Sequence, residues 1–296
     1  MRSIALPLML SACVITLVGP SFARASRTVG SLSCVVSGTS WSTAGMVEDL
    51  EKDLLREFQG YAKKVAAEYE IQRAASREGK LILRPEPVLN WTNPVEGKVY
   101  GSTFIWTLNV RPEAIGDVHR WHINAGVGEE HTFHSLSLST IVVQRRGQLV
   151  WHPAKPGVEL KPVPGAPKPA DSTTTRLQQM KSLARQFEAF MYPDRNRFAL
   201  RLLTQPIYRY ESTDPDLLDG GLFTFVRSTD PAVLLLVESR RTDEGHEWQY
   251  GLARMNALAL DVVRDNRIVS DFPNRWDRVR WDRKDPFTAF LEREDR

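Results

Sequence analysis

Cysteine is nearly absent from this sequence, whose 296 residues include only Cys13 and Cys34. Cys13 lies in an apolar N-terminal run that we expect to be removed, so the mature chain has a single thiol and no internal disulfide. An exported chain of this length needs none, because its core can be large enough without covalent cross-links.

Excess charge of either sign is also lacking. The formal charge is +3, and Arg2 and Arg24 lie in the N-terminal segment, so the mature chain is left near +1. This balance excludes whole-chain attraction to polyanions, and we therefore expect no nucleic-acid partner. No later segment approaches the length of about 18 uncharged apolar residues that a membrane span needs, so we expect none in the mature chain.

The sequence motifs of well-known catalytic sites are missing as well. The chain contains no G-x-S-x-G, no H-E-x-x-H, no P-loop and no dinucleotide-binding fingerprint. Nucleophilic catalysis has no recognisable starting point here. The sequence therefore favours a non-catalytic module over an enzyme.

The N-terminus has the composition of a secretory signal. Arg2 supplies the positive charge, Ile4–Val18 is an apolar run, and Ala23-Arg24-Ala25 offers small residues for cleavage. We expect a signal peptide at residues 1–25 and a flexible, Ser/Thr/Gly-rich leader at 26–42. The mature protein is then secreted or periplasmic.

A lipoprotein anchored at Cys13 is the alternative for this segment. Leu10-Ser11-Ala12-Cys13 matches a bacterial lipoprotein box, which would place a lipid on the cysteine. Against this interpretation, the apolar run continues past Cys13 and the stretch before it is short.

Two stretches have the spacing of amphipathic helices. In the first, apolar residues recur every three or four positions from Val47 to Tyr69, and Gly79 is expected to end the helix. In the second, Asp171-Ser172 is expected to cap a helix whose apolar stripe runs from Leu177 to Met191. Both stripes predict packing against a sheet.

The most informative stretch for the sheet is Gly220–Arg240, which reads as a strand, a turn and a second strand. Asp230-Pro231 is the expected turn, because proline presets φ and aspartate bonds nearby backbone. Val233–Val237 is a run of apolar residues. Such a run predicts a strand covered on both faces, in the middle of the sheet.

Together these patterns predict an α+β fold. We expect a curved, mostly antiparallel sheet of about eight to ten strands, with one long N-terminal helix and a second mid-chain helix packed on it. Residues 43–273 form one domain, with a Pro-rich strap at 153–169. Residues 274–296 form a charged, Trp-containing tail with a short helix that begins at Asp285-Pro286.

Four of the six histidines fall close together, at His119, His122, His131 and His134. Imidazoles are ligands that zinc accepts, so this cluster is the candidate metal site. On strands, however, residues three positions apart face opposite sides of the sheet, which would split each pair. We therefore expect no cofactor, with a zinc-dependent hydrolase that uses the cluster as the alternative.

Trp276 and Trp281 in the tail are the candidate binding residues. Indole rings flanked by arginines can stack on sugar rings, which makes a polysaccharide a possible partner. Large aromatic side chains are more often buried, so packing of both rings onto the domain is the competing interpretation.

Six runs form a series along the chain: Asn90–Pro94, Phe104–Thr107, His131–Leu136, Arg176–Met180, Pro206–Tyr210, and Thr229–Pro231 with the Leu-rich strand after it. In this order they resemble a large family of exported bacterial proteins with no assigned function. The resemblance covers about residues 48–270. It implies export and a shared domain, and it carries no catalytic residues.

The sequence thus predicts an exported envelope or periplasmic protein of unknown function. Its most favoured role is a non-catalytic structural or binding module, whose partner is an envelope component or a polysaccharide. The alternative is a metal-dependent hydrolase that uses the cluster from His119 to His134.

Overall fold

The structure of the protein is a computed structural model that describes residues 43–75, 79–123, 126–193, 196–212, 215–276 and 282–292. The fold below is that of the compact unit Ala44–Arg296. The predicted signal peptide, the leader and both cysteines lie outside the described residues.

The described chain folds into two α-helices, one short 3-10 turn and eighteen strands, so the predicted α+β class is confirmed. The helices are α1 (Thr43–Ala67) and α2 (Thr173–Ala184), and the 3-10 turn is η1 (Pro94–Glu96). The strands are β1 (Tyr69–Arg73), β2 (Ile82–Leu83), β3 (Leu89–Thr92), β4 (Lys98–Leu108), β5 (Arg111–Ile123), β6 (Gly126–Ser135), β7 (Ile141–Arg145), β8 (Gln148–Trp151), β9 (Lys161–Pro162), β10 (Phe187–Met191), β11 (Phe198–Leu202), β12 (Tyr208–Glu211), β13 (Leu217–Arg227), β14 (Asp230–Thr242), β15 (Gly245–Arg254), β16 (Leu260–Arg264), β17 (Arg267–Phe272) and β18 (Phe287–Glu292).

These strands form three antiparallel sheets of nine, six and three strands. The nine-stranded sheet has the order β17-β16-β10-β11-β13-β14-β15-β9, with β12 also paired to β13. The six-stranded sheet has the order β18-β6-β5-β4-β2, with β3 also paired to β4, and β1-β7-β8 form the third sheet.

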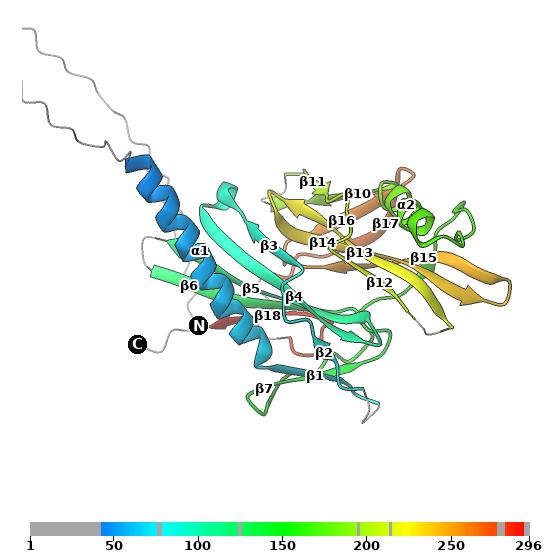
Figure 1. Cartoon of the computed structure of the whole chain (residues 1–296), viewed down its shortest axis with the longest axis horizontal. Coiled ribbons are helices and arrows are strands. Elements are labelled where there is room, and N and C mark those ends of the chain that lie inside the picture. Colours follow the sequence, from blue (N-terminus) through cyan, green and yellow to red (C-terminus); the bar gives the residue numbers. More distant parts are fainter. Residues whose placement is uncertain are drawn as a thin grey trace, which may run out of the picture. The chain divides into compact units, whose positions relative to one another are not determined.

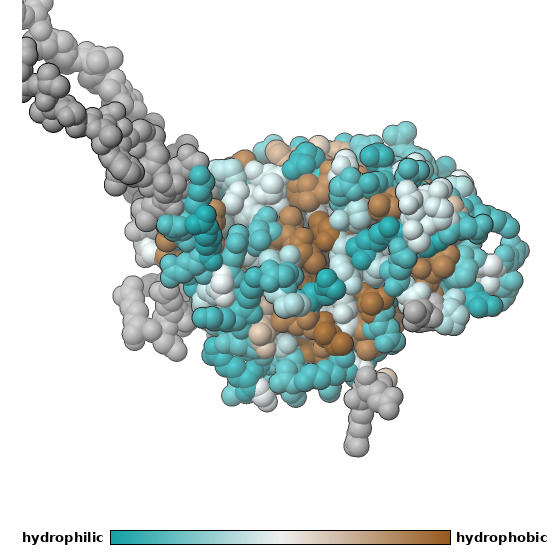
Figure 2. Space-filling view, viewed as in Figure 1, coloured by the Kyte–Doolittle hydropathy of each residue, from teal (hydrophilic) through white to brown (hydrophobic). Residues whose placement is uncertain are grey.

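The two large sheets face each other, and each has one helix on its outer side (Figure 1). Neighbouring residues on a strand point to opposite faces, so Trp106 packs with α1 while Ile105 packs with Leu234 of the other sheet. Leu235 then points outward into a cluster with α2. Apolar residues visible in Figure 2 gather in a band over the region between the sheets.

The predicted central strand is confirmed. Every residue of Val233–Val237 is fully buried, and β14 is paired on both sides, with β13 and with β15. Its residues contribute alternately to the core under α2 and to the core between the sheets. In the described part of the chain, neither helix is both long and apolar enough to cross a membrane.

The two halves of the fold are repeats of one another. Strands β3 to β8 begin at residues 89, 98, 111, 126, 141 and 148, and strands β12 to β17 begin at 208, 217, 230, 245, 260 and 267, so each counterpart follows by 119 positions. The pairing is repeated too: β1 pairs with β7 as β10 pairs with β16, and β3 pairs with β4 as β12 pairs with β13. Even single contacts recur, since the Trp91 ring lies on Gly101 as the Tyr210 ring lies on Gly220.

The repeats also exchange edge strands. The Pro-rich strap follows the first repeat, yet its strand β9 pairs with β15 of the second. The C-terminal strand β18 follows the second repeat and pairs with β6 of the first. The strap strand β9 and the C-terminal strand β18 therefore each cover a sheet edge that would otherwise expose unpaired backbone groups.

Several predicted elements were wrong at their ends. α1 stops at Ala67 and Tyr69 begins β1, while the apolar stripe of the second helix ends at Ala184 and continues as β10. In both places the buried residues fit a strand as well as a helix, with β10 burying alternate residues from Phe187 to Met191. Pairing with β7 and β16 selected the strand.

The expected turn and the expected closing helix also differ. The hairpin turns at Ser228-Thr229, with Ser228 at a φ of 59°, and Asp230 already belongs to β14. The segment after Asp285 is strand β18 instead of a helix. Asp285 accepts a hydrogen bond from the backbone N–H of Phe287, which makes a local turn that leads into the strand.

Candidate functional site

A cavity of about 360 Å³ lies where the first repeat meets the second, and we call it the Trp–Asp cavity. Side chains from β5, β6 and β14 reach it, together with aromatic rings from β3 and from the tail. Its lining residues are Trp91, Glu96, Val99, Asp117, His119, Trp121, Glu130, Thr132, Asp230, Met255, Asn256, Ala257, Trp276 and Phe287.

Strand β5 supplies the polar centre of this cavity. Asp117, His119 and Trp121 alternate along the strand and therefore share one face. The Nε1–H of Trp91 donates to Oδ1 of Asp117 at 3.0 Å, and Nδ1 of His119 lies 3.4 Å from Oδ2 of the same carboxylate. The indole of Trp276 is 53 % exposed and lies at the rim.

Two groups in the cavity have shifted pKa values. Burial of the His119 ring opposes its protonation, but the nearby carboxylate of Asp117, whose Oδ2 lies 3.4 Å from Nδ1, outweighs this effect and raises the pKa of His119. Burial of the Asp230 carboxyl, reinforced by the negative charge of Asp117, raises the pKa of Asp230 to about 7. Near neutral pH, Asp230 can therefore donate or accept a hydrogen bond, while Asp117 accepts and His119 can donate.

The second repeat has the same position filled. Equivalent residues of the two repeats are 119 positions apart. Glu238 of the second repeat is therefore equivalent to His119 of the first, and Asp230 of the second repeat is equivalent to Arg111 of the first. Nε of Arg111 donates to Oε1 of Glu238 at 2.9 Å, and the hydroxyl of Tyr210 donates to the same oxygen at 2.6 Å. All three of these side chains are buried. The long arginine and glutamate bridge the gap, whereas the shorter His119 and Asp230 leave it open.

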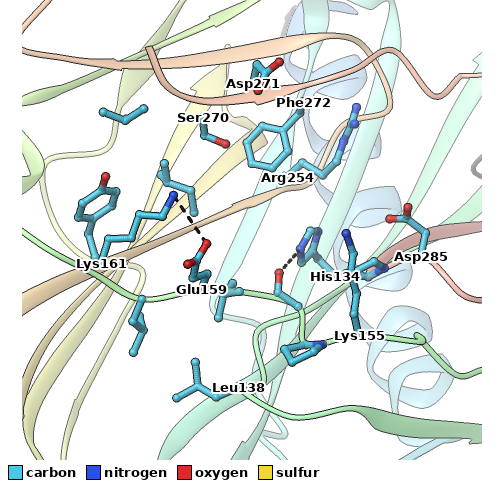
Figure 3. Close-up of a pocket in the computed structure, with 18 of the residues that line it drawn as sticks. His134, Leu138, Lys155, Glu159, Lys161, Arg254, Ser270, Asp271, Phe272 and Asp285 are labelled. Atoms are coloured by element: carbon cyan, nitrogen blue, oxygen red, sulfur yellow. Dashed lines mark hydrogen bonds and ion pairs between the residues drawn. The ribbon is translucent and has the colours of Figure 1, made fainter. Parts of the chain in front are cut away.

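The four clustered histidines are not brought together. His119 faces the Trp–Asp cavity, and His134 lines a different cavity beside the strap, shown in Figure 3. His131 and His122 point to the α1 side of the sheet, where His131 contacts Tyr69 and His122 contacts Tyr100. The expected splitting of each H-x-x-H pair is therefore confirmed, and the described residues contain no group of three or more histidine, cysteine or acidic side chains placed to hold a metal.

Both ring nitrogens of His131 already have partners. Nε2 donates to Oε1 of Glu129 at 3.0 Å, since a carboxylate can only accept, and Nδ1 then accepts from the hydroxyl of Tyr69 at 2.7 Å. Glu129 also binds Tyr61 and Arg120. The arrangement is that of a buried structural network under α1.

This network predicts a pH effect on stability. Burial opposes ionisation of Glu129, but hydrogen bonds from His131, Tyr61 and Arg120 outweigh it and lower the pKa of Glu129 to about 2. The stabilisation is present above the ordinary pKa of 4.5 and is lost as the pH falls toward 2. We expect Glu129→Gln to lower the free energy of unfolding by about 2–3 kcal/mol at pH 7, and by progressively less below pH ~4.5. Urea denaturation of both proteins between pH 7 and pH 3 measures this, and a difference that stays constant with pH would contradict it.

The two candidate tryptophans have different outcomes. Trp276 lines the Trp–Asp cavity together with His119, so one binding candidate and one metal candidate meet in the same place. Trp281 lies outside the described residues. The sequence interpretation missed Trp91, Asp117 and Asp230, although Asp117 and His119 stand two positions apart, a spacing that places both side chains on one face of a strand.

Comparisons of this chain with models of protein families, with curated proteins and with solved structures give no match.

Proposed function

We propose that this chain is an exported, non-catalytic binding module of the cell envelope, and that the Trp–Asp cavity holds a short saccharide. The observation that carries this proposal is the difference between the two repeats. A buried ion pair closes the position in the second repeat, while the first repeat keeps a cavity of about 360 Å³ at the same position. Export is supported by the signal-like N-terminal segment.

The chemistry of the lining supports a saccharide in particular. Trp121 and Trp276 offer ring faces on which the C–H face of a sugar can stack. Asp117, His119 and Asp230 offer acceptors and donors within one small space, and sugar hydroxyls need both. A volume near 360 Å³ suits one or two sugar rings, at the lower end of typical ligand pockets.

Replacement of Trp276 by alanine tests this assignment. We expect soluble oligosaccharides such as chitotetraose or maltotetraose to bind, and the variant to bind about thirtyfold more weakly, because a stacked tryptophan contributes about 2 kcal/mol. Isothermal titration calorimetry measures both affinities. Ile82→Ala is the control, since Ile82 is 69 % exposed and lies on β2, away from the cavity. Equal affinities of Trp276→Ala and Ile82→Ala would contradict the proposal.

The alternative is a metal-dependent hydrolase. It would need at least two of the clustered imidazoles at one ion, and therefore a rearrangement of β5 or β6. Elemental analysis of protein purified without a histidine tag separates the two proposals. One bound zinc per chain, lost on His119→Ala or on His131→Ala, would favour the hydrolase.

A further inference from the structure

A second cavity, of about 750 Å³, lies between the Pro-rich strap and strands β15 and β17 (Figure 3). We call it the strap cavity. One part of its lining is apolar and includes Leu138, Leu160, Leu252 and Phe272. The rest is polar or charged: Lys155, Lys161, Arg254 and Arg275 are basic, Glu159, Asp271 and Asp285 are acidic, and Arg275 pairs with Asp285. The strap cavity is separate from the Trp–Asp cavity, and no lining residue belongs to both.

Arg254 brings a buried positive charge to this cavity. The residue is 2 % exposed, and its guanidinium donates to three backbone carbonyls, those of Asn256, Pro273 and Leu258, at 2.6–2.7 Å. Within the described residues, no carboxylate forms an ion pair with it. Burial, reinforced by the charge of Arg275, lowers the pKa of Arg254 to about 10. The hydrogen bonds of this buried cation all go to neutral carbonyls, and the charge of Asp285 offsets its desolvation only in part, so the site favours an anion.

His134 supplies a buried polar atom without a partner. The residue is 4 % exposed, and its Nε2 lies 3.2 Å from the carbonyl oxygen of Gly157 in the strap. A carbonyl only accepts, so Nε2 carries the hydrogen. Burial, with the charge of Arg254, lowers the pKa of His134 to about 4, so the ring is neutral and Nδ1 bears a lone pair. This Nδ1 is buried and makes no hydrogen bond.

We propose that the strap cavity binds an amphiphilic anion. Its carboxylate or phosphate lies near Arg254 and Lys155, and its aliphatic chain follows Leu138, Leu160 and Phe272. A hydroxyl close to the charged group donates to Nδ1 of His134. The site is built from the strap and from both repeats, so a bound ligand fastens the strap to the sheets.

Calorimetric titration of the intact chain with ten-carbon probes tests this inference. We expect decanoate to bind at least about tenfold more tightly than decanol, which lacks the charge, and than acetate, which lacks the chain. Decyl phosphate beside decanoate distinguishes a phosphate from a carboxylate headgroup. We expect 3-hydroxydecanoate to bind about fivefold more tightly than decanoate, through His134. Equal binding of decanol and decanoate, or no binding of either anion, would overturn the proposal, and equal binding of the two acids would overturn the role of His134.

Lys155→Glu is the variant of choice, because Lys155 is exposed on the strap, whereas Arg254 also holds the backbone around it. We expect about fivefold weaker decanoate binding in this variant. Lys64→Glu makes the same charge change on the exposed side of α1 and should leave the affinity unchanged. An equal loss of decanoate affinity in both variants would mean that only the overall charge of the protein matters, and would contradict binding in the strap cavity. Trp276→Ala should bind decanoate as tightly as the natural protein does. A failure of the saccharide proposal can therefore be told apart from a failure of the strap-cavity proposal.

Discussion

Replacement of Glu238 by alanine is expected to lower the free energy of unfolding by about 3–5 kcal/mol. The carboxylate of Glu238 is fully buried and accepts hydrogen bonds from Arg111, Tyr210 and Arg240. The variant leaves the guanidinium of Arg111, itself 5 % exposed, with part of its compensating charge removed. Desolvation of an incompletely paired charge costs more than the pair contributes, which is why a single truncation has a large effect.

Urea denaturation followed by circular dichroism measures this loss. Arg111→Met combined with Glu238→Leu should recover only part of it, because the apolar pair removes the unpaired guanidinium but takes a partner from the buried carboxylate of Glu113 and from the buried hydroxyl of Tyr210. Glu70→Ala is the matched control: its ion pair with Lys80 is well exposed, so we expect a change below about 0.5 kcal/mol. If Glu238→Ala is as stable as this control, the buried ion pair of Arg111 and Glu238 does not hold the two repeats together at this position.

A substitution in the Trp–Asp cavity is expected to stabilise the protein instead. Asp230→Asn should raise the free energy of unfolding at pH 8 by about 2–4 kcal/mol. The folded-state pKa of Asp230 is raised from 3.8 to about 7, so the native state keeps a proton that the unfolded state releases. Stability of the natural protein therefore falls as the pH rises between these two values, and the variant escapes that fall.

Denaturation at a series of pH values between 4 and 8 shows this directly. The two proteins should be equally stable near pH 4 and should diverge toward pH 8. Asp265→Asn is the control, since its carboxyl is 73 % exposed at the β16–β17 turn and its removal should leave the pH profile unchanged. A difference that does not grow with pH would contradict the raised pKa of Asp230.

The same variant should lose saccharide affinity. Asparagine cannot carry the negative charge that Asp230 bears on part of the molecules near pH 7, so a charge-assisted hydrogen bond from a sugar hydroxyl is weakened. A gain in stability together with a loss of binding is characteristic of functional sites, where an unfavourable group is retained for its ligand. If Asp230→Asn is stabilised and still binds the saccharide with full affinity, the saccharide does not bind at Asp230.

Much of the fold could be predicted because it rests on local patterns. The run Val233–Val237 indicated a strand buried on both faces, and the structure has it in the interior of the nine-stranded sheet, paired on both sides. The limits of the helices could not be predicted in the same way. Tyr69 and Phe187 continue a helical stripe and also begin an alternating one, and long-range pairing with β7 and β16 decided between them.

The structural repeat is only weakly visible in the sequence. At a spacing of 119, identical residues include Gly101 and Gly220, Phe104 and Phe223, Pro112 and Pro231, Gly126 and Gly245, and Arg145 and Arg264. The two glycines of the first pair each lie under an aromatic ring, and the two phenylalanines are buried in the core. The two prolines lie near the start of a strand, the glycines of the fourth pair each begin a strand, and the two arginines end a strand. The residues between them diverged, because many side chains can fill a sheet face of the same shape.

The sequence by itself determined the class of fold, the buried central strand and the separation of each histidine pair, since all three follow from the alternation of side chains along a strand. Only the tertiary structure decided which residues share a cavity. His119 and Asp230 line one cavity because the two repeats pack face to face, and their spacing in the chain carries no trace of that proximity. Packing also decided that one site is closed by an arginine and a glutamate while its counterpart stays open, since side-chain length matters only once the two sheets have fixed the gap to be bridged.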